Sequence, residues 1–333
     1  MRREPFRYGP AVDGIRSDDV IVVGGGVIGL TTAIVLAESG RRVRVWTRDP
    51  AERTTSAVAG ALWWPYRIEP EALVGAWSLE SLTVYEELAE RPGQTGVRVV
   101  EGVHGETELD GLGAWAARVP GMRAATTEEY PPGTGLWARL PLIDMPVHLR
   151  WLRGRLAAAG GVVEERSVRG LAEAAARAPV VVNCSGLGAR ELVPDPAVRP
   201  VRGQLVVVGN PGVRTWLTSV DHTSAAPTYV FPQSDVVILG GTAEEDAWSL
   251  TPDPGVAEAI VRRCAALCPE LAGARVLGHR VGLRPARDAV RLEREELPGG
   301  GTVVHNYGHG GAGVTVAWGC AREAAALAGA AAA

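Results

Sequence analysis

The sequence predicts an α/β fold in which a discontinuous Rossmann-like domain with a parallel sheet is joined to a second domain with a mainly antiparallel β-sheet. Three observations lead to this prediction. An apolar strand runs through a glycine turn into a helix near the start of the chain, similar units recur much later, and short β-rich runs separate them. The chain has 333 residues, 46% of them hydrophobic, which is enough for two domains. The predicted Rossmann-like domain comprises residues 18–65, 144–198 and 282–333, and the second domain comprises residues 66–143 and 199–281.

The first unit carries a nucleotide-binding motif. The apolar run Val20–Val23 leads directly into Gly24-Gly25-Gly26-Val27-Ile28-Gly29, and an apolar helix follows. In such a turn the first glycine allows a tight bend, the second lets the backbone approach a pyrophosphate, and the third lets the helix pack closely on the strand. Because the helix N-terminus then faces the phosphates, this unit predicts a dinucleotide site.

The second strand is predicted over residues 41–46, and it ends in Thr47-Arg48-Asp49-Pro50. This is the position at which the ribose of a dinucleotide is bound. An acidic residue there favours an unphosphorylated ribose, whereas an arginine can hold a 2′-phosphate. The chain offers both Arg48 and Asp49, so these residues leave FAD, NAD and NADP open.

A later unit extends the predicted parallel sheet. A helix opens at Met145 and ends at Gly160-Gly161, and a strand begins at Val162. The apolar run 179–183 then stops at Cys184-Ser185-Gly186, which is typical of a buried parallel strand whose carboxyl end faces a ligand crevice.

The last unit is a strand over residues 301–306, a glycine turn over residues 307–313 and a helix over residues 314–327. Between the units, regions 67–143 and 200–250 contain short β-rich runs separated by Gly, Pro and Asp turns. These runs predict the antiparallel sheet, which is the expected place for a substrate cap.

Two features near the end of the chain are candidate ligand contacts. The segment from Asn306 to Thr315 contains more glycines than a plain turn needs, which favours a backbone that faces a planar ligand. Arg284 precedes a proline after a short apolar run, and a guanidinium binds a carboxylate through two parallel hydrogen bonds. Position alone is equally consistent with a surface ion pair.

Composition excludes several functions. A net charge of −4 and scattered arginines predict neither a nucleic-acid partner nor an anionic membrane partner. The chain contains no lysine, so a Schiff-base mechanism is excluded. Residues 1–19 lack the apolar run of a signal peptide, and no stretch is long enough to span a membrane, so we expect a cytoplasmic protein.

The four cysteines are too few for a disulfide framework. Cys264 and Cys268 are one helical turn apart and could share a metal, but matched ligands are missing, and small buried residues are the favoured reading. No metal site is predicted.

Taken together, the motifs resemble the D-amino-acid oxidase family over residues 18–328. The matching segments are residues 24–29, 58–66, 182–186, 282–285 with 291–295, and 305–313 followed by 318–320. The resemblance implies an FAD-containing oxidase that takes a hydride from Cα of a D-amino acid and is reoxidised by dioxygen. The products would be a 2-oxo acid, ammonia and hydrogen peroxide.

The resemblance also implies roles for individual residues. Arg284 matches the clamp for the substrate carboxylate, Tyr229 matches the carboxylate-binding tyrosine, and the carbonyl of Gly311 matches the acceptor for the substrate amine. His305 and His309 are expected to be structural hydrogen-bonding residues. The positions that match FAD contacts are Gly24, Gly25, Gly26, Val27, Ile28, Gly29, Arg48, Asp49, Thr55, Ser56, Gly60, Ala61, Leu62, Val168, Ser185, Gly310, Gly311, Ala312, Gly313, Val314 and Thr315.

Three positions depart from the family pattern. Residues 221–226 lack the tyrosine that vertebrate relatives carry on a mobile lid, Ala312 replaces an aromatic residue, which would widen the pocket, and the Asp-Arg order after the second strand is reversed to Arg48-Asp49. Chemistry of this kind requires orientation of the substrate more than a side-chain base, because the cofactor carries the difficult step.

The expected substrates are neutral D-amino acids, with basic ones left open. A D-aspartate oxidase is the near alternative, with His222 or Arg214 as partners of a second carboxylate. A glycine or sarcosine oxidase is more distant, because its sarcosine-type relatives use a lysine near the flavin. A flavin-binding regulator and a nicotinamide dehydrogenase are the alternatives of other classes. A homo-oligomer is left open, and the C-terminal Ala331-Ala332-Ala333 is not a peroxisomal tripeptide, so a bacterial enzyme is expected.

Overall fold

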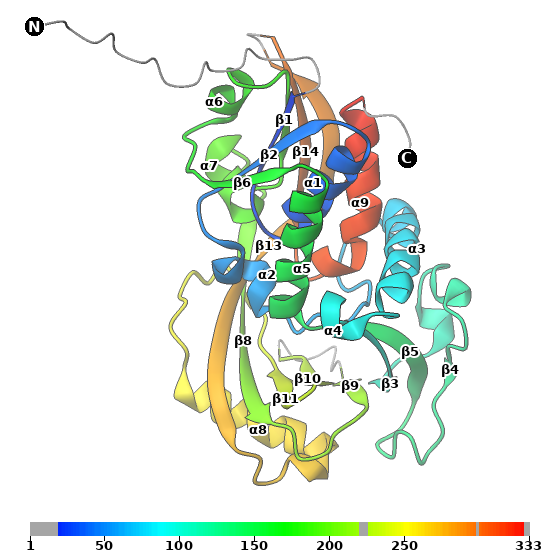
Figure 1. Cartoon of the computed structure of the whole chain (residues 1–333). Coiled ribbons are helices and arrows are strands. Elements are labelled where there is room, and N and C mark those ends of the chain that lie inside the picture. Colours follow the sequence, from blue (N-terminus) through cyan, green and yellow to red (C-terminus); the bar gives the residue numbers. More distant parts are fainter. Residues whose placement is uncertain (1–18, 220–225, 298–299, 330–333) are drawn as a thin grey trace, which may run out of the picture.

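The computed structural model describes residues 19–219, 226–297 and 300–329, and its strands form one continuous mixed sheet (Figure 1). One end of this sheet is parallel and has the order β14-β7-β1-β2-β6, as the Rossmann-like prediction requires. Its strands are β1 (Asp19–Val23), β2 (Arg42–Thr47), β6 (Val162–Glu165), β7 (Val180–Asn183) and β14 (Thr302–His309). The predicted α/β class is confirmed.

Helices cover both faces of the parallel strands. On one face α1 (Val27–Glu38) packs between α5 (Met145–Ala158) and α9 (Gly313–Leu327). On the other face α6 (Leu171–Ala175) packs against Ile21 and Trp46, and α7 (Ala189–Leu192) follows β7. The strands read as unbroken apolar runs because both of their faces are buried, and Val20, Ile21 and Val22 have no exposed surface.

The other end of the sheet is mainly antiparallel, as predicted. Among the described strands at this end, only β3 and β9 pair in parallel. The helix α8 (Pro254–Leu267) covers β8, β10 and β11, and its Ile260 and Cys264 are buried there. The strands are β3 (Val97–Gly105), β4 (Arg123–Ala124), β5 (Gly135–Ile143), β8 (Arg199–Gly209), β9 (Trp216–Ser219), β10 (Thr228–Pro232), β11 (Val236–Gly240), β12 (Glu244–Glu245) and β13 (Val276–Glu296). Short helices are α2 (Thr55–Val58) and α4 (Pro92–Thr95), with 3₁₀ turns at Ala51–Arg53, Leu109–Gly111, Ala116–Arg118, Gly186–Gly188 and Pro269–Leu271.

The prediction that region 67–143 contains only short β-rich runs is wrong. The region contains α3 (Glu71–Leu88), which packs against α9 (Figure 1). The helix was missed because two of its fully buried positions, Ser78 and Ser81, are polar, and because Pro70 precedes it without a side-chain cap. Because these buried positions are polar, the helical spacing of apolar residues is not visible in the sequence.

A single long strand joins the two ends of the sheet. β13 pairs with β8 through its first half and with β14 through its second half, and it continues through Pro285, which lies opposite Pro200. The predicted domain boundary at residue 282 falls inside this strand, and the division into two domains stays a prediction. β14 continues to His309, beyond the predicted end at residue 306.

All four cysteines are buried and free. Among the described residues, no helix is long and apolar enough to cross a membrane.

Candidate functional site

The first glycine turn lies at the carboxyl ends of β1 and β7, and it is packed too tightly for side chains. A Cβ atom on Gly24 would lie 2.3 Å from the carbonyl oxygen of Cys184, and one on Gly29 would lie 1.9 Å from that of Gly24. Gly24 also has φ of 119°, in the region that favours glycine. The glycines therefore bring α1 against the strand ends.

The N-terminus of α1 presents backbone N–H groups to this crevice. Gly26, the N-cap residue, has no side chain to satisfy them, and Val27 N donates to Ser56 Oγ at 3.0 Å. The first N–H groups of a helix have no partner within the helix, so those of Ile28 and Gly29 can bind an anion. Ser56, predicted as a cofactor contact, borders this anion site.

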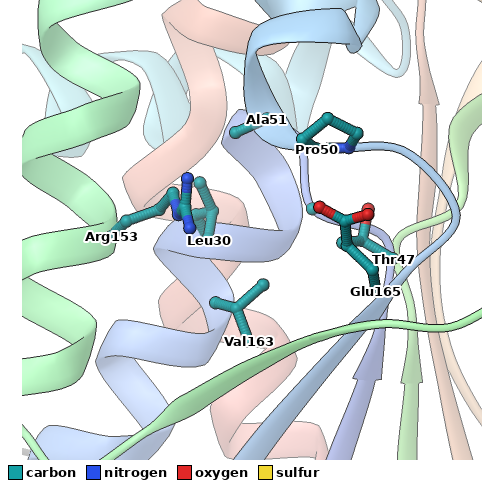
Figure 2. Close-up of a pocket in the computed structure, with 8 residues that line it drawn as sticks. Leu30, Thr47, Pro50, Ala51, Arg153, Val163 and Glu165 are labelled. Carbon is teal, nitrogen blue, oxygen red and sulfur yellow. The ribbon is translucent and has the colours of Figure 1, made fainter.

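A small pocket of 80 Å³ lies beside the turn, between the ends of β2 and β6 and the helices α1 and α5 (Figure 2). Its lining includes Gly25 and Thr47, together with Glu165, which sequence reasoning missed. The predicted ribose contacts Arg48 and Asp49 form an ion pair with each other at 2.9 Å, and the Arg48 side chain is 76% exposed. Val168 lies half-buried against the cluster that contains Trp46.

The last glycine turn meets the first one. A Cβ atom on Gly313, at the start of α9, would lie 3.8 Å from Ile28 Cδ1. The N-cap residue of α9, Ala312, makes no side-chain hydrogen bond to the first turn of that helix. Two helix N-termini therefore converge from α1 and α9. This arrangement and the glycine packing fit a cofactor with a pyrophosphate and an electron-accepting ring, as FAD has.

Arg284, Tyr229 and Gly311, the three predicted catalytic residues, come together at the edge of this crevice. A Cβ atom on Gly311 would lie 3.4 Å from Arg284 Cδ and 3.5 Å from Tyr66 Cδ1. The Arg284 guanidinium lies near enough to the Tyr229 phenol to act on its pKa. Tyr66 was missed as a site residue, although it lies within one of the matching motifs.

Both polar side chains are fixed by their surroundings. Arg284 Nη1 donates to the carbonyl of Thr242 at 2.9 Å. The Tyr229 ring lies against bare backbone, since a Cβ atom on Gly240 would be 1.8 Å from it. Burial raises the pKa of Tyr229, and the neighbouring Arg284 only partly offsets this effect. The phenol is therefore neutral at neutral pH and can donate a hydrogen bond to a carboxylate.

Other predicted cofactor contacts have partners of their own. Thr55 Oγ1 donates to the carbonyl of Leu283 at 3.0 Å, and Thr315 Oγ1 donates to the carbonyl of Trp64 at 2.9 Å. A Cβ atom on Gly60 would lie 2.8 Å from the Phe231 ring. The remaining predicted contacts in the two segments are Ala61 and Val314, which are buried, and Leu62 and Gly310, which are half-buried.

Ser185 belongs to a buried polar chain. Asn183 Oδ1 accepts from Ser185 N at 3.2 Å and from Ser185 Oγ at 2.6 Å, and Asn183 Nδ2 lies 3.3 Å from His305 Nδ1. His305 Nε2 lies 3.0 Å from Glu295 Oε2. Since an amide N–H₂ only donates, His305 Nδ1 accepts and its Nε2–H donates to Glu295. The expected structural role of His305 is confirmed.

His309 was expected to form structural hydrogen bonds, and this expectation is wrong for its Nε2 atom. His309 is buried, and its Nε2 has no partner within the described part of the chain. The ring is packed among its neighbours, and this burial lowers its pKa to about 3. Ala312 is also buried, and the expectation that its small side chain widens the pocket stays a prediction. His222 and most of the lid segment 221–226 lie outside the described residues, and Arg214 is exposed.

Residues 19–327 match the family model described as FAD dependent oxidoreductase. The chain is 73% identical over 318 residues to a D-amino-acid oxidase from Streptomyces coelicolor, covering 95% of this chain and 98% of the relative. It is 36% identical over 323 residues to the human D-aspartate oxidase, covering 92% and 94%. Among solved structures, glycine oxidase from Geobacillus kaustophilus superposes with a TM-score of 0.78 at 21% identity, covering 93% and 94%.

Proposed function

The chain belongs to the family of FAD-dependent oxidoreductases, and from this premise we propose that it is a D-amino-acid oxidase. It converts a D-amino acid, dioxygen and water into a 2-oxo acid, ammonia and hydrogen peroxide. The observation that carries the proposal is its high identity, over nearly the whole chain, to the Streptomyces enzyme. The grouping of Arg284, Tyr229 and Gly311 at the cofactor crevice supports it.

We propose that the chain holds FAD by backbone more than by side chains. The N–H groups at the start of α1 bind the pyrophosphate, Ser56 orders that turn, and the start of α9 stabilises negative charge at the ring. When bound, FAD supplies the redox chemistry, because it takes two electrons from the substrate and returns them to dioxygen.

The substrate is held by its two polar groups. Arg284 binds the carboxylate through paired hydrogen bonds, and the neutral Tyr229 phenol donates a third. The carbonyl of Gly311 accepts from the amine, which fixes a second direction around Cα. With both directions fixed, only one enantiomer would turn its Cα hydrogen towards the bound cofactor. Orientation of this kind accounts for much of a rate enhancement without a side-chain base.

The side-chain preference is a separate proposal. We propose neutral D-amino acids as the main substrates, with basic ones as a weaker group. One observation favours a test of D-aspartate: the guanidinium of Arg67 lies 5.3 Å from the centre of the Tyr66 ring, so a second cation is near the clamp. A bacterial cytoplasmic location and a homo-oligomer stay predictions.

The test is the visible spectrum of the purified protein under anaerobic conditions, before and after addition of D-alanine, L-alanine, D-arginine or D-aspartate. Loss of the flavin absorbance with D-alanine and not with L-alanine is expected. Loss with D-aspartate alone would assign the protein to the acidic branch. A spectrum that none of the D-amino acids changes would contradict the proposed function.

A further inference from the structure

We infer that Gly203 and Thr242 are positioning residues that form a seat for the Arg284 guanidinium and so set the affinity for the substrate carboxylate. The inference rests on the proposed function. Gly203 lies on β8, next to the strand that carries Arg284. A Cβ atom on Gly203 would lie 2.6 Å from Arg284 Nη2 and 2.7 Å from both Cζ and Nη1. The guanidinium therefore rests on bare backbone.

Space, not backbone conformation, is what requires glycine at position 203. The φ angle of Gly203 is outside the left-handed region that other residues avoid, so an alanine there would not strain the chain. All three nearest atoms belong to the end of the Arg284 side chain. An added methyl group would therefore displace the guanidinium and leave the strand in place.

Thr242 completes the seat from a second segment. Its carbonyl accepts from Arg284 Nη1 at 2.9 Å, and its Oγ1 accepts from Gln204 N at 2.9 Å. Position and orientation of the guanidinium are thus fixed by β8 and by the residue that follows Gly240-Gly241. The same two glycines receive the Tyr229 ring.

The seat matters because a paired contact with a carboxylate needs the plane of the guanidinium in one orientation. Arginine has several rotatable bonds, and ordering them on binding would reduce the affinity. A guanidinium that is already held by Gly203 and Thr242 avoids this loss. The seat acts only through Arg284, so it affects carboxylate ligands and not FAD.

The test compares Gly203→Ala with Gly209→Ala, a control on the same strand whose Cβ would meet no atom closer than 4.0 Å. The probe is pyruvate, the 2-oxo acid product from D-alanine, and its Kd is measured by perturbation of the flavin spectrum. We expect the Kd for pyruvate and the KM for D-alanine to rise about tenfold or more in Gly203→Ala. The Kd for FAD and the Tm should stay within about twofold and a few degrees of those of Gly209→Ala.

A double-mutant cycle identifies Arg284 as the route of the effect. Gly203→Ala should cost nothing further in the Arg284→Ala background, because the displaced group is already gone. A full additive loss there, or unchanged pyruvate binding in Gly203→Ala, would overturn the inference. If Gly203→Ala does not fold, Thr242→Val is the second variant, because it removes the hydroxyl that accepts from Gln204 N without adding bulk. It should raise the Kd for pyruvate by a smaller factor and leave the Kd for FAD unchanged. Failure of the proposed function is distinguished by the wild-type protein, which would then not be reduced by D-alanine.

Discussion

Asn183 connects the exposed end of β13 with the cofactor crevice. Its side chain has no exposed surface, yet each polar atom has a partner: His305 on one side and Ser185 on the other. Glu295, half exposed on β13, completes the chain beyond His305. The orientation of one buried amide therefore decides whether the N–H and hydroxyl groups of Ser185 are held in place.

We expect Asn183→Ala to weaken FAD binding by about tenfold or more. The substitution leaves the Ser185 N–H and His305 Nδ1 without their partner in a buried place, and the loop that carries Ser185 lies beside the glycine turn. The Kd is measured by flavin fluorescence during titration of apoprotein with FAD.

Asn210→Ala is the control for Asn183→Ala. The Asn210 Oδ1 atom accepts two hydrogen bonds, as Asn183 Oδ1 does, but both come from backbone N–H groups, at 2.9 and 2.8 Å, and Asn210 follows β8 away from the crevice. It should lower the Tm and leave the Kd for FAD unchanged. Equal FAD affinity in the two variants would show that Asn183 supports the fold alone.

The glycine turns and Arg284 were candidates from their own residue patterns, whereas Tyr229 was a candidate only through the family resemblance, and the roles of these residues stay predictions. Gly203, Thr242 and Asn183 were not predictable as functional parts. Their contacts join segments far apart in the chain, such as Asn183 with His305, and nothing local in the sequence announces such a pair. Glu165 was missed for the same reason, whereas Tyr66 was missed although it lies within one of the matching motifs.

At the scale of elements, the strands and helices with an unbroken apolar pattern were predicted closely. The helix predicted to open at Met145 and the strand expected from Val162 begin at those residues. The helix α3 was not predicted, because its contact with α9 is partly polar. Ser81 Oγ accepts from Trp318 N and Gly319 N at 3.1 and 3.0 Å. Buried polar contacts of this kind break the period on which helix prediction depends.

The crossing of α3 and α9 requires a glycine at position 319. A Cβ atom there would lie 2.4 Å from the Cα atom of Trp77 and 2.5 Å from its carbonyl oxygen. Both atoms are backbone, so neither helix can yield without separating from the other. We expect Gly319→Ala to lower the free energy of unfolding by about 1–3 kcal/mol in total, because the steric clash outweighs the gain in helix propensity of about 1 kcal/mol.

Gly154→Ala is the matched control for Gly319→Ala. Gly154 lies inside α5, and a Cβ atom there would meet nothing within 4 Å. The gain in propensity is then unopposed, and the free energy of unfolding should rise by about 0.5–1 kcal/mol. Urea denaturation of the holoenzyme measures both variants. A stabilised Gly319→Ala would contradict the close contact.

For the whole molecule, buried neutral histidines make stability depend on pH. His148 lies between Tyr85 and Trp151, and its Nδ1 donates to the carbonyl of Thr95 at 2.8 Å. Its Nε2 has no partner among the described residues. Burial lowers the pKa of His148 to about 4, and the same cause lowers that of His309 to about 3. The folded protein therefore keeps both rings neutral where an unfolded chain protonates them.

The sign of the pH effect follows from these two states. Above about pH 6.5 neither state binds the proton, and the stability from the neutral rings is complete. As the pH falls from 6.5 towards 4, the unfolded state binds protons that the folded state does not bind, so the free energy of unfolding drops by about 1.4 kcal/mol per pH unit for each histidine.

His148→Asn keeps a donor for Thr95 and cannot titrate, so it should remove one such contribution. Urea denaturation of the wild type and of His148→Asn at pH 7 and pH 5 measures the slope. A slope in His148→Asn equal to that of the wild type would mean that this ring is protonated in the folded protein.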